Sequence, residues 1–326
     1  MMQRRVFTGA AAAGLLGLQL GPVRAQTAFP QSPITMYVGF APGGGTDVVA
    51  RLLARYIEKH LGRGAAVVIQ NRPGAGGGIA FGAIANATPD GLTTGFINSP
   101  SVLTIPIERK TNFTSRSFDF LGNVIDDPAN FSVLADSPVH SLKDLAALAR
   151  SKPGALNVGT AGAGSDDHLA LLQFERAAGV KLNHIPFKGG SEVHTALLSK
   201  TIDVAAMNIG EAMQYAKGGS PLRQIGQMGS SRSVVAPDVP TFREQGYDIV
   251  LSSLRGIAAP KGLPAPVREL LVKAIQQAVA DPEFKARALA QFAPVRYLSP
   301  AQFEEELRTA EIGLRKLWDE LPWTDK

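Results

Sequence analysis

The regular alternation of short apolar runs with amphipathic helical patterns constrains the fold of this chain more than any other feature. Ile34–Val38 has the length of a buried strand, Asp47–Leu61 repeats apolar residues at helical spacing, and Ala66–Ile69 is the next strand. A strand, a helix and a strand at this spacing predict a right-handed βαβ unit and therefore a parallel sheet. The runs Leu92–Ile97 and Phe118–Val124 are predicted to add two more strands.

A second alternating set begins near residue 131, and a tail with a different pattern follows it. For this set we predict five strands, Phe131–Leu134, Leu156–Gly159, Asn183–Phe187, Ile202–Met207 and Arg223–Gln227, and four helices, Ser141–Ser151, Ser165–Ala178, Val193–Leu198 and Glu211–Ala216. Ser141 and Asp144 are spaced as a capping box. The tail after Pro260 is mostly helical, with predicted helices at Pro266–Ala280, Pro282–Gln291 and Pro300–Leu321.

This order of elements predicts an α/β fold with two lobes. A chain of 326 residues usually exceeds one compact unit, so two domains are expected. We expect the second lobe to be inserted into the first, with the helical tail returning to the first. Lobe 1 would comprise residues 26–128 and 236–326 and lobe 2 residues 129–235, with chain crossings near 125–130 and 230–250.

The first 25 residues have the pattern of an export signal rather than of a folded element. Met1–Arg5 carries two positive charges, Gly9–Leu20 is a small apolar run, and Val23–Ala25 fits the small-x-small rule for cleavage before Gln26. The apolar run is shorter than the roughly 20 residues that span a bilayer. We therefore expect residues 1–25 to be removed and the mature chain to be soluble in the periplasm. The early arginine pair also resembles a twin-arginine signal, so Sec and Tat export both stay open.

Composition excludes several classes of function. The chain has no cysteine, which excludes disulfides, thiolate metal sites, cysteine nucleophiles and a lipid on an N-terminal cysteine. Removing Arg4, Arg5 and Arg24 with the export signal would lower the formal net charge from +5 to +2. With no lysine or arginine run and only 7% aromatic residues, the chain lacks the pattern of a nucleic-acid binder. The five histidines are scattered without metal-ligand spacing, so we expect no metal. We also expect no cofactor, and a monomer is the default expectation.

Three glycine-rich loops carry the strongest chemical signal. They are Phe40–Asp47, Asn71–Gly78 and Gly159–Ser165, and the first and third lie between a predicted strand and its helix. Glycine lets the backbone approach a ligand closely, and a strand-to-helix loop aims free N–H groups and the positive end of a helix at one point. Because ligands of open α/β sheets bind at the carboxyl ends of strands, loops from two lobes can converge on one small anion.

The same loops argue against two other kinds of site. None has the Gly-Lys-Ser/Thr of a Walker loop or a full G-x-G-x-x-G followed by an acid, and Asp47 and Asp166 would repel a polyphosphate. Ser165 and His168 could form a nucleophile and base, but no G-x-S-x-G elbow surrounds the serine. An exported serine hydrolase therefore remains only an alternative. Asp47 is expected to cap the first helix or hold a water rather than to contact the ligand.

At these loops the sequence resembles the Bug family, the extracytoplasmic receptors of tripartite tricarboxylate transporters. The matching elements occur in family order over nearly the whole mature chain: Ala41–Asp47 (APGGGTD), Asn71–Gly78 (NRPGAGGG), Pro89–Gly91 (PDG), Thr160–Leu169 (TAGAGSDDHL), His184–Gly190 (HIPFKGG), Pro237–Thr241 (PDVPT) and Ala259–Gly262 (APKG). The resemblance implies a type II periplasmic-binding fold with a hinge, in which the first and third loops hold one ligand carboxylate, often through ordered water.

By position, the resemblance assigns ligand contacts to Ala41, Gly43, Gly44, Thr46, Asp47, Thr160, Gly162, Gly164, Ser165 and His168. Polar residues at strand ends and flanking side chains add the candidates Phe40, Asn71, Ser99, Lys188 and Asn208. Phe40 could equally be core, and Lys188 could equally be solvated. Arg255 stands where the family usually has an aromatic residue; we expect a solvated surface arginine there, with pairing to a second ligand carboxylate as the alternative.

The sequence therefore predicts a non-enzymatic periplasmic solute-binding protein. Its ligand would be a small carboxylate: an organic acid, an aromatic acid or an acidic amino acid. The resemblance implies a membrane permease of a tripartite transporter as its partner. A ligand-binding sensor component that reports to a signalling receptor is the main alternative.

Overall fold

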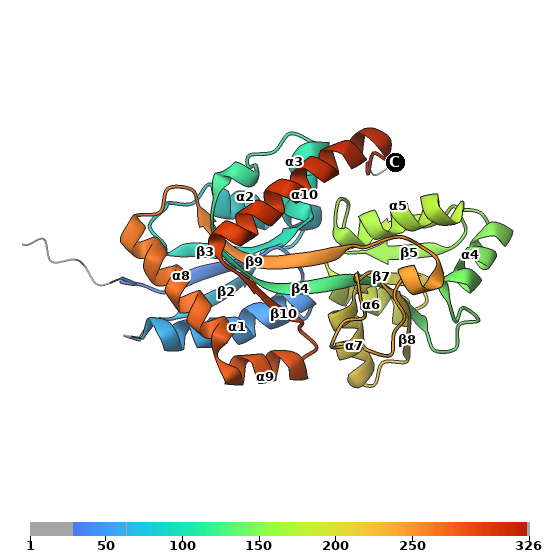
Figure 1. Cartoon of the computed structure of the whole chain (residues 1–326), viewed down its shortest axis with the longest axis horizontal. Helices are drawn as coiled ribbons and strands as arrows, with labels where there is room; N and C mark the ends of the chain where they lie inside the picture. The colour runs from blue at the N-terminus through green and yellow to red at the C-terminus, as the bar shows by residue number, and fades with distance from the viewer. Residues whose placement is uncertain (1–28, 63, 325–326) are drawn as a thin grey trace, which may run out of the picture.

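The computed structural model describes residues 29–62 and 64–324, which form two α/β lobes lying side by side (Figure 1). The lobes share one mixed sheet of ten strands, and the long strand β4 (Phe118–Leu134) runs from one lobe into the other. The predicted two-lobe α/β architecture is thus confirmed. The predicted export signal, residues 1–25, lies outside the described residues.

Lobe 1 is a sheet covered by helices on both faces. Its strands follow the order β2–β1–β3–β9–β4 with β10 beside β4, and their bounds are Ile34–Val38 (β1), Val67–Asn71 (β2), Thr93–Ser99 (β3), Ser252–Pro260 (β9) and Val295–Leu298 (β10). One face packs on α1 (Gly45–Leu61), α8 (Ala265–Ala280) and α9 (Pro282–Ala290). The other face packs on α2 (Gly78–Ala85), α3 (Ser101–Glu108) and α10 (Pro300–Glu320). The parallel pairing of β1 with β2 and β3 confirms the predicted βαβ unit.

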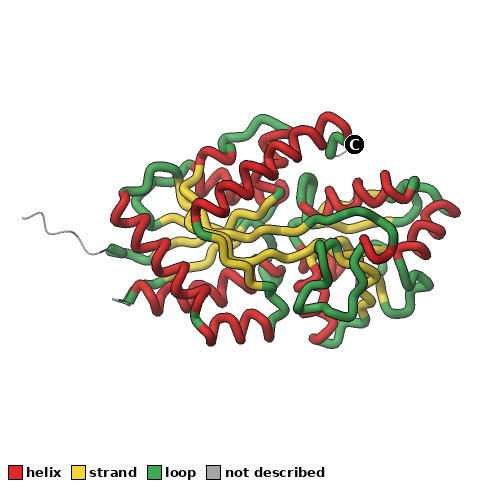
Figure 2. The backbone as a smooth tube through the Cα atoms, viewed as in Figure 1, coloured by secondary structure: helices red, strands yellow, loops and turns green. Residues whose placement is uncertain are grey.

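Lobe 2 repeats this layered arrangement on a smaller sheet (Figure 2). Its strands are the end of β4, β5 (Asn157–Thr160), β6 (Asn183–Pro186), β7 (Val204–Asn208) and β8 (Leu222–Gln227). Its helices are α4 (Leu142–Ser151), α5 (Asp166–Ala178), α6 (Gly190–Leu198) and α7 (Ile209–Lys217). α4 and α5 pack on one face and α6 and α7 on the other. The parallel strands of each lobe, β1 to β3 in lobe 1 and β5 to β7 in lobe 2, point their carboxyl ends at the boundary between the lobes, which is where parallel α/β sheets place their ligands.

Five elements depart from the sequence prediction. We predicted two strands, Phe118–Val124 and Phe131–Leu134, where one continuous strand β4 runs through the junction. Its segment Phe118–Pro128 pairs with β9, and the rest pairs with β7 and β8. The acids and proline in the middle of β4 had the appearance of a turn. The helices α2 and α3 and the strands β9 and β10 were not predicted at all.

The missed strand β9 is interrupted in sequence by Arg255 and Gly256, so it lacks the long apolar run of a central strand. Gly256 is needed there because a Cβ atom at this position would overlap the ring of Phe303. The other predicted helices and strands overlap the observed ones. At α4, Ser141 Oγ accepts from Asp144 N–H at 3.2 Å, but the Asp144 carboxylate accepts from His140 N–H, so the reciprocal half of the predicted capping box is not formed.

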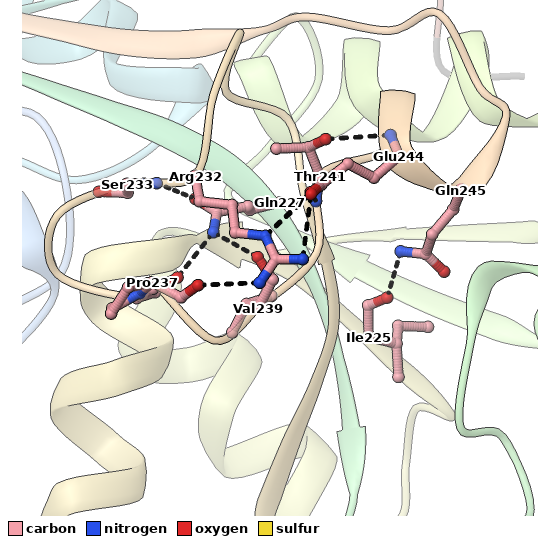
Figure 3. Close-up of polar contacts among 10 residues, drawn as sticks. Ile225, Gln227, Arg232, Ser233, Pro237, Val239, Thr241, Glu244 and Gln245 are labelled. Atoms are coloured by element: carbon pink, nitrogen blue, oxygen red, sulfur yellow. Dashed lines mark hydrogen bonds and ion pairs between the residues drawn. The ribbon is translucent and has the colours of Figure 1, made fainter.

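The connection from β8 back to lobe 1, residues 228–251, is held by its own polar contacts (Figure 3). Gln227 Nε2 donates to the carbonyls of Ala236 at 2.9 Å and Val239 at 2.8 Å. The Arg232 guanidinium pairs with Glu244 at 3.0 Å. This loop returns the chain to the start of β9, and the Gln227 side chain at the end of β8 supplies the donor for two of its backbone carbonyls.

Among the described residues, no helix combines the length and apolar character required to cross a membrane.

Candidate functional site

The glycine loops of the two lobes touch across the boundary between them. Ala41 N–H, between β1 and α1, donates to the carbonyl of Lys188 in lobe 2 at 3.1 Å. The loop after β2 meets the loop after β5, where a Cβ atom on Gly76 would stand 2.8 Å from the Ala163 carbonyl oxygen. Gly76 and Gly162 also have φ values of 64° and 119°, which side chains rarely adopt. The sequence places glycine at these positions because the lobes approach each other backbone to backbone.

Asp47 organises the loop between β1 and α1. Its carboxylate accepts from Gly43 N–H at 2.9 Å and from Asn71 Nδ2 at 2.8 Å, and it pairs with Arg51 at 2.9 Å. Although burial opposes ionisation of Asp47, the hydrogen bonds from Arg51, Gly43 and Asn71 lower its pKa below the ordinary value. The carboxylate is therefore satisfied within lobe 1, where it fixes the shape of the loop in front of α1.

A carboxylate from lobe 2 occupies the N-terminus of α1. Glu211, in the first turn of α7, accepts a hydrogen bond from Gly45 N–H, the first residue of α1. Its other oxygen would lie 2.6 Å from a Cβ atom on Gly190 at the start of α6. Glu211 is only 7% exposed. The free N–H groups and the positive end of the α1 dipole therefore bind a carboxylate in this structure. Glu211 was not among the predicted site residues.

Arg255 is buried at the centre of a polar network that joins the lobes. It is 2% exposed, and its Nη2 lies 2.6 Å from Asn208 Oδ1 and 3.2 Å from Asp127 Oδ2. Asn208 in turn donates to Asp166 Oδ2 at 2.6 Å. The expectation that Arg255 is a solvated surface arginine is therefore wrong. Its strand β9 lies inside the sheet between β3 and β4, so the side chain points into the junction rather than into solvent.

Burial shifts the protonation of the acids in this network. Desolvation raises the pKa of Asp127 to about 7, although Arg255 and the N–H of Gly210 favour its ionised form. Desolvation raises the pKa of Asp166 to about 6, although the hydrogen bond from Asn208 opposes this shift. The pKa of Asp167 is also raised well above its ordinary value, by desolvation and by the neighbouring charge of Asp166. The junction is thus poor in positive charge and shielded from water.

The loop between β5 and α5 presents Thr160, Ser165 and His168 as buried groups. Ser165 Oγ accepts from His168 N–H at 3.2 Å and caps α5, while His168 Nδ1 accepts from Gly164 N–H at 3.2 Å. His168 stacks on His184 with ring centroids 3.9 Å apart. Desolvation and the nearby His184 lower the pKa of His168 to about 3, so its ring is neutral. The serine and histidine are therefore engaged with the backbone rather than arranged as nucleophile and base.

The remaining candidates divide into those at the junction and those outside it. Thr46 Oγ1, in the first turn of α1, accepts from Asn98 Nδ2 at 2.9 Å, and both side chains are buried. Phe40 is buried beside Asn71, which donates to the Phe40 carbonyl at 3.1 Å. Ser99 lines a cavity of about 530 Å³ between α5 of lobe 2 and α10 of lobe 1. The side chain of Lys188 is exposed, and only its carbonyl meets the other lobe.

Sequence reasoning missed Glu211, Asp127 and Arg255 as parts of one site. Each acid has an ordinary local explanation in the sequence. Glu211 stands in the first turn of a helix, where acids are favoured, and Asp127 stands in a segment that has the appearance of a turn. The available signal was positional: Glu211 follows the strand β7 just as Asp166 follows β5, so both acids lie at the carboxyl ends of parallel strands. No group of three or more His, Asp or Glu residues in the described part of the chain is arranged to hold a metal ion.

Comparison with known proteins agrees with this geometry. The model of the tripartite tricarboxylate transporter receptor family matches residues 49–308. A protein of Cupriavidus necator described as "UPF0065 protein in gbd 5'region" is 34% identical over 297 residues, which cover 89% of each chain.

Solved structures agree as well. The periplasmic binding protein BugD has 29% identity and a TM-score of 0.85, and the match covers 91% of this chain and 100% of BugD. MatC from Rhodopseudomonas palustris, solved with bound malate, has 26% identity and a TM-score of 0.81 over 89% of this chain and 99% of its own. These matches confirm the resemblance to the Bug family and the type II periplasmic-binding fold. The chain belongs to the tripartite tricarboxylate transporter receptor family, whose members are periplasmic solute-binding proteins rather than enzymes.

Proposed function

We propose that this protein captures a small carboxylate between its two lobes and delivers it to the membrane permease of a tripartite transporter. The observation that carries this proposal is the Glu211 carboxylate on the N-terminus of α1. An internal carboxylate already satisfies the Gly45 N–H group at the boundary between the lobes. A solute carboxylate that displaces Glu211 would meet the same donor and the same helix dipole.

The loop between β5 and α5 supports the same reading from the opposite lobe. This loop precedes α5, a second helix whose N-terminus points at the junction. Ser165 and Thr160 contribute hydroxyl groups beside the glycines of the loop. In this proposal the backbone of the loop around Gly43 and Gly44 and that of the loop around Gly162 and Gly164 hold the solute carboxylate. Ala41, Thr46 and His168 would complete its surroundings, and Asp47 would hold the first loop in shape.

Access to this site requires the lobes to separate, because their loops are in contact in this structure. We place the hinge where β4 passes between lobes, near Asp127 and Pro128, and in the connection of residues 228–251. Residues 26–128 and 236–326 would then move against residues 129–235. Closure of two lobes around a solute is a common form of hinge motion.

Relatives and the N-terminal sequence support the remaining parts of the proposal. MatC is 26% identical and was solved with malate, a small dicarboxylate. The pattern of residues 1–25 supports cleavage near Ala25 and release of a soluble chain into the periplasm.

Thermal unfolding of the chain from Gln26 in the presence of mono-, di- and tricarboxylates, amino acids and aromatic acids tests the proposal. A ligand at a hundred times its Kd adds about 2.7 kcal/mol to the stability of the native state, which gives a clear rise in Tm. The expected result is a shift by one class of acid that Thr46→Val abolishes, while the matched control Thr195→Val, on the exposed face of α6, retains it. Absence of any shift, with co-purified ligand first removed by refolding, would refute the proposal.

A deletion strain separates transport from sensing. The proposal predicts that uptake of the identified acid is lost without this protein. Unchanged uptake with lost induction of the corresponding genes would favour the sensor alternative.

A further inference from the structure

Three hydrogen bonds join the loop between β1 and α1 to lobe 2 in the described part of the chain. Two of them use backbone N–H groups of the loop, those of Ala41 and Gly45. The third has the opposite direction, because Tyr215 Oη on α7 donates to the carbonyl of Gly43 at 3.1 Å. Lobe 2 therefore holds this loop through two of its donors and one of its acceptors.

Tyr215 and Glu211 make neighbouring contacts from one face of α7. They are four residues apart, so their side chains project from the same side of the helix. Glu211 accepts from Gly45 N–H, and Tyr215 donates to the carbonyl of Gly43. Gly43 is also fixed from lobe 1, because its N–H group donates to Asp47 at 2.9 Å. The loop is thus held from both lobes at the same glycine.

The phenol ring of Tyr215 is held in place by lobe 2. The ring of His194, on α6, stacks on it with centroids 4.0 Å apart and planes 1° apart. His194 Nε2 lies 2.9 Å from Ser220 Oγ, which fixes the imidazole in turn. Burial and the nearby charge of Glu211 raise the pKa of Tyr215, so its hydroxyl group keeps its proton and donates. The Gly43 carbonyl therefore meets a preorganised donor.

The two contacts of α7 differ in what a solute carboxylate can replace. A carboxylate only accepts hydrogen bonds, so it can compete with Glu211 for the Gly45 N–H group. It has no donor to offer to the Gly43 carbonyl. The bond from Tyr215 therefore stabilises the closed lobes to the same extent with either carboxylate, that of Glu211 or that of the solute, at the N-terminus of α1.

On the basis of the proposed function, we propose that Tyr215 is a positioning residue that controls the rate of solute exchange. Its hydrogen bond to Gly43 must break each time the lobes open, both to admit a solute and to release it. Because the bond stabilises both closed forms alike, its contribution cancels from the Kd while the closed forms predominate. Tyr215 slows entry and release together, whereas Glu211 affects affinity.

The distance between two labels measures closure of the lobes without a solute. The chain has no cysteine, so Lys285→Cys on α9 of lobe 1 and Thr195→Cys on α6 of lobe 2, both exposed, accept a fluorescent donor and acceptor selectively (Figure 1). Tyr215→Phe keeps the ring and removes only the hydroxyl group. In single-molecule energy transfer we expect this variant to raise the ratio of open to closed molecules about fivefold, the effect of losing one hydrogen bond between neutral groups.

Exchange of a radiolabelled acid measures entry and release separately. Rapid filtration uses the acid with the largest Tm shift among malate, citrate, glutamate and benzoate. In Tyr215→Phe we expect the association and dissociation rate constants each to rise about fivefold, with the Kd changed by less than about twofold. Tyr297→Phe, in the core of lobe 1, is the matched control and should keep the wild-type open ratio and rates.

A second variant shows whether His194 acts through the Tyr215 hydroxyl group. His194→Ala removes the stacked ring, so it should raise the open ratio and both rate constants when Tyr215 is present. In the Tyr215→Phe background it should have little further effect, because the bond that it supports is already absent. Equal effects of His194→Ala in both backgrounds would contradict this role of His194.

The outcomes separate this inference from the proposed function. A wild-type open ratio and wild-type rates in Tyr215→Phe would overturn the inference. Faster release with unchanged entry and weaker binding would overturn it too, because the bond would then belong to the solute-bound form alone. If none of the acids binds to any variant, the proposed function fails, and the open ratio still decides whether Tyr215 holds the lobes shut.

Discussion

Glu211→Gln should increase the affinity of this protein for its solute. In the structure, Glu211 holds the Gly45 N–H group that the solute carboxylate needs, so the solute must first displace it. Glutamine keeps the shape and a carbonyl acceptor but loses the negative charge. The substitution also removes one charge that acts on Asp127, Asp166 and Asp167.

The size of the effect follows from the contact that is lost. A hydrogen bond to a charged group contributes about 1.5–3 kcal/mol net, and one between neutral groups about 0.5–1.5 kcal/mol. The difference, about 1–1.5 kcal/mol, is the stabilisation of the unliganded closed form that the solute no longer has to overcome. It corresponds to roughly a tenfold lower Kd.

Calorimetric titration of wild type and Glu211→Gln with the acid that binds best in the thermal screen measures this change. Glu304→Gln is the matched control, because Glu304 lies on the exposed side of α10 in the same protein. A Kd of Glu211→Gln that equals or exceeds that of the wild type would refute the reasoning. It would mean that the solute carboxylate does not compete with Glu211 for the N-terminus of α1.

Three further predictions concern closure and protonation. Both tryptophans lie near the C-terminus, and Trp323 Nε1 lies 3.6 Å from a Cβ atom built on Gly164 in the other lobe. Tryptophan fluorescence should therefore change on solute binding in Trp318→Phe, which keeps Trp323, but not in Trp323→Phe. Gly76→Ala should weaken solute binding about tenfold in calorimetry, because a left-handed backbone costs a residue with a side chain about 1–2 kcal/mol and the new Cβ atom meets the opposite lobe. Gly154→Ala is the control: Gly154 also has a positive φ, 72°, but open space around it, so this variant has the backbone strain without the contact and should bind normally. Burial raises the folded-state pKa of Asp127 to about 7, so the contribution of the protonated side chain to stability is present at low pH and is lost as the pH rises from about 4 through 7. In denaturant unfolding, lowering the pH from 7 to 5 should therefore raise the free energy of unfolding of the wild type by about 1 kcal/mol or more relative to that of Asp127→Asn.

The sequence predicted best those elements that are determined by local pattern. The strand Ile34–Val38 was predicted with its observed bounds, because its β-branched and apolar residues favour a strand and Ile34, Met36 and Val38 alternate into the core. The helix starting behind Ser165 was likewise predicted correctly, since the serine caps it. Glycine loops between strands and helices located the junction of the lobes for a similar reason: only glycine allows such close backbone approach.

The rest of the site depends on contacts that no local pattern contains. Arg255 and Asp127 place charges inside the strands β9 and β4. Each charge is explained by its ion pair with the other, which lies 128 residues away in the chain. Glu211 has the local pattern of an acid stabilising its own helix, yet its hydrogen bond joins it to Gly45, 166 residues earlier. Such pairs are fixed by how the lobes meet, so the sequence indicated an anion site but not the acids that surround it.

A crystal structure of the chain from Gln26 with its best-binding acid would show where the solute carboxylate binds. We expect this carboxylate to accept from Gly45 N–H at the N-terminus of α1, with the Glu211 side chain moved away from it. We also expect the loop before α5 to lie on the other side of the solute. A solute carboxylate bound elsewhere, with Glu211 still on Gly45, would mean that the N-terminus of α1 is not the carboxylate site.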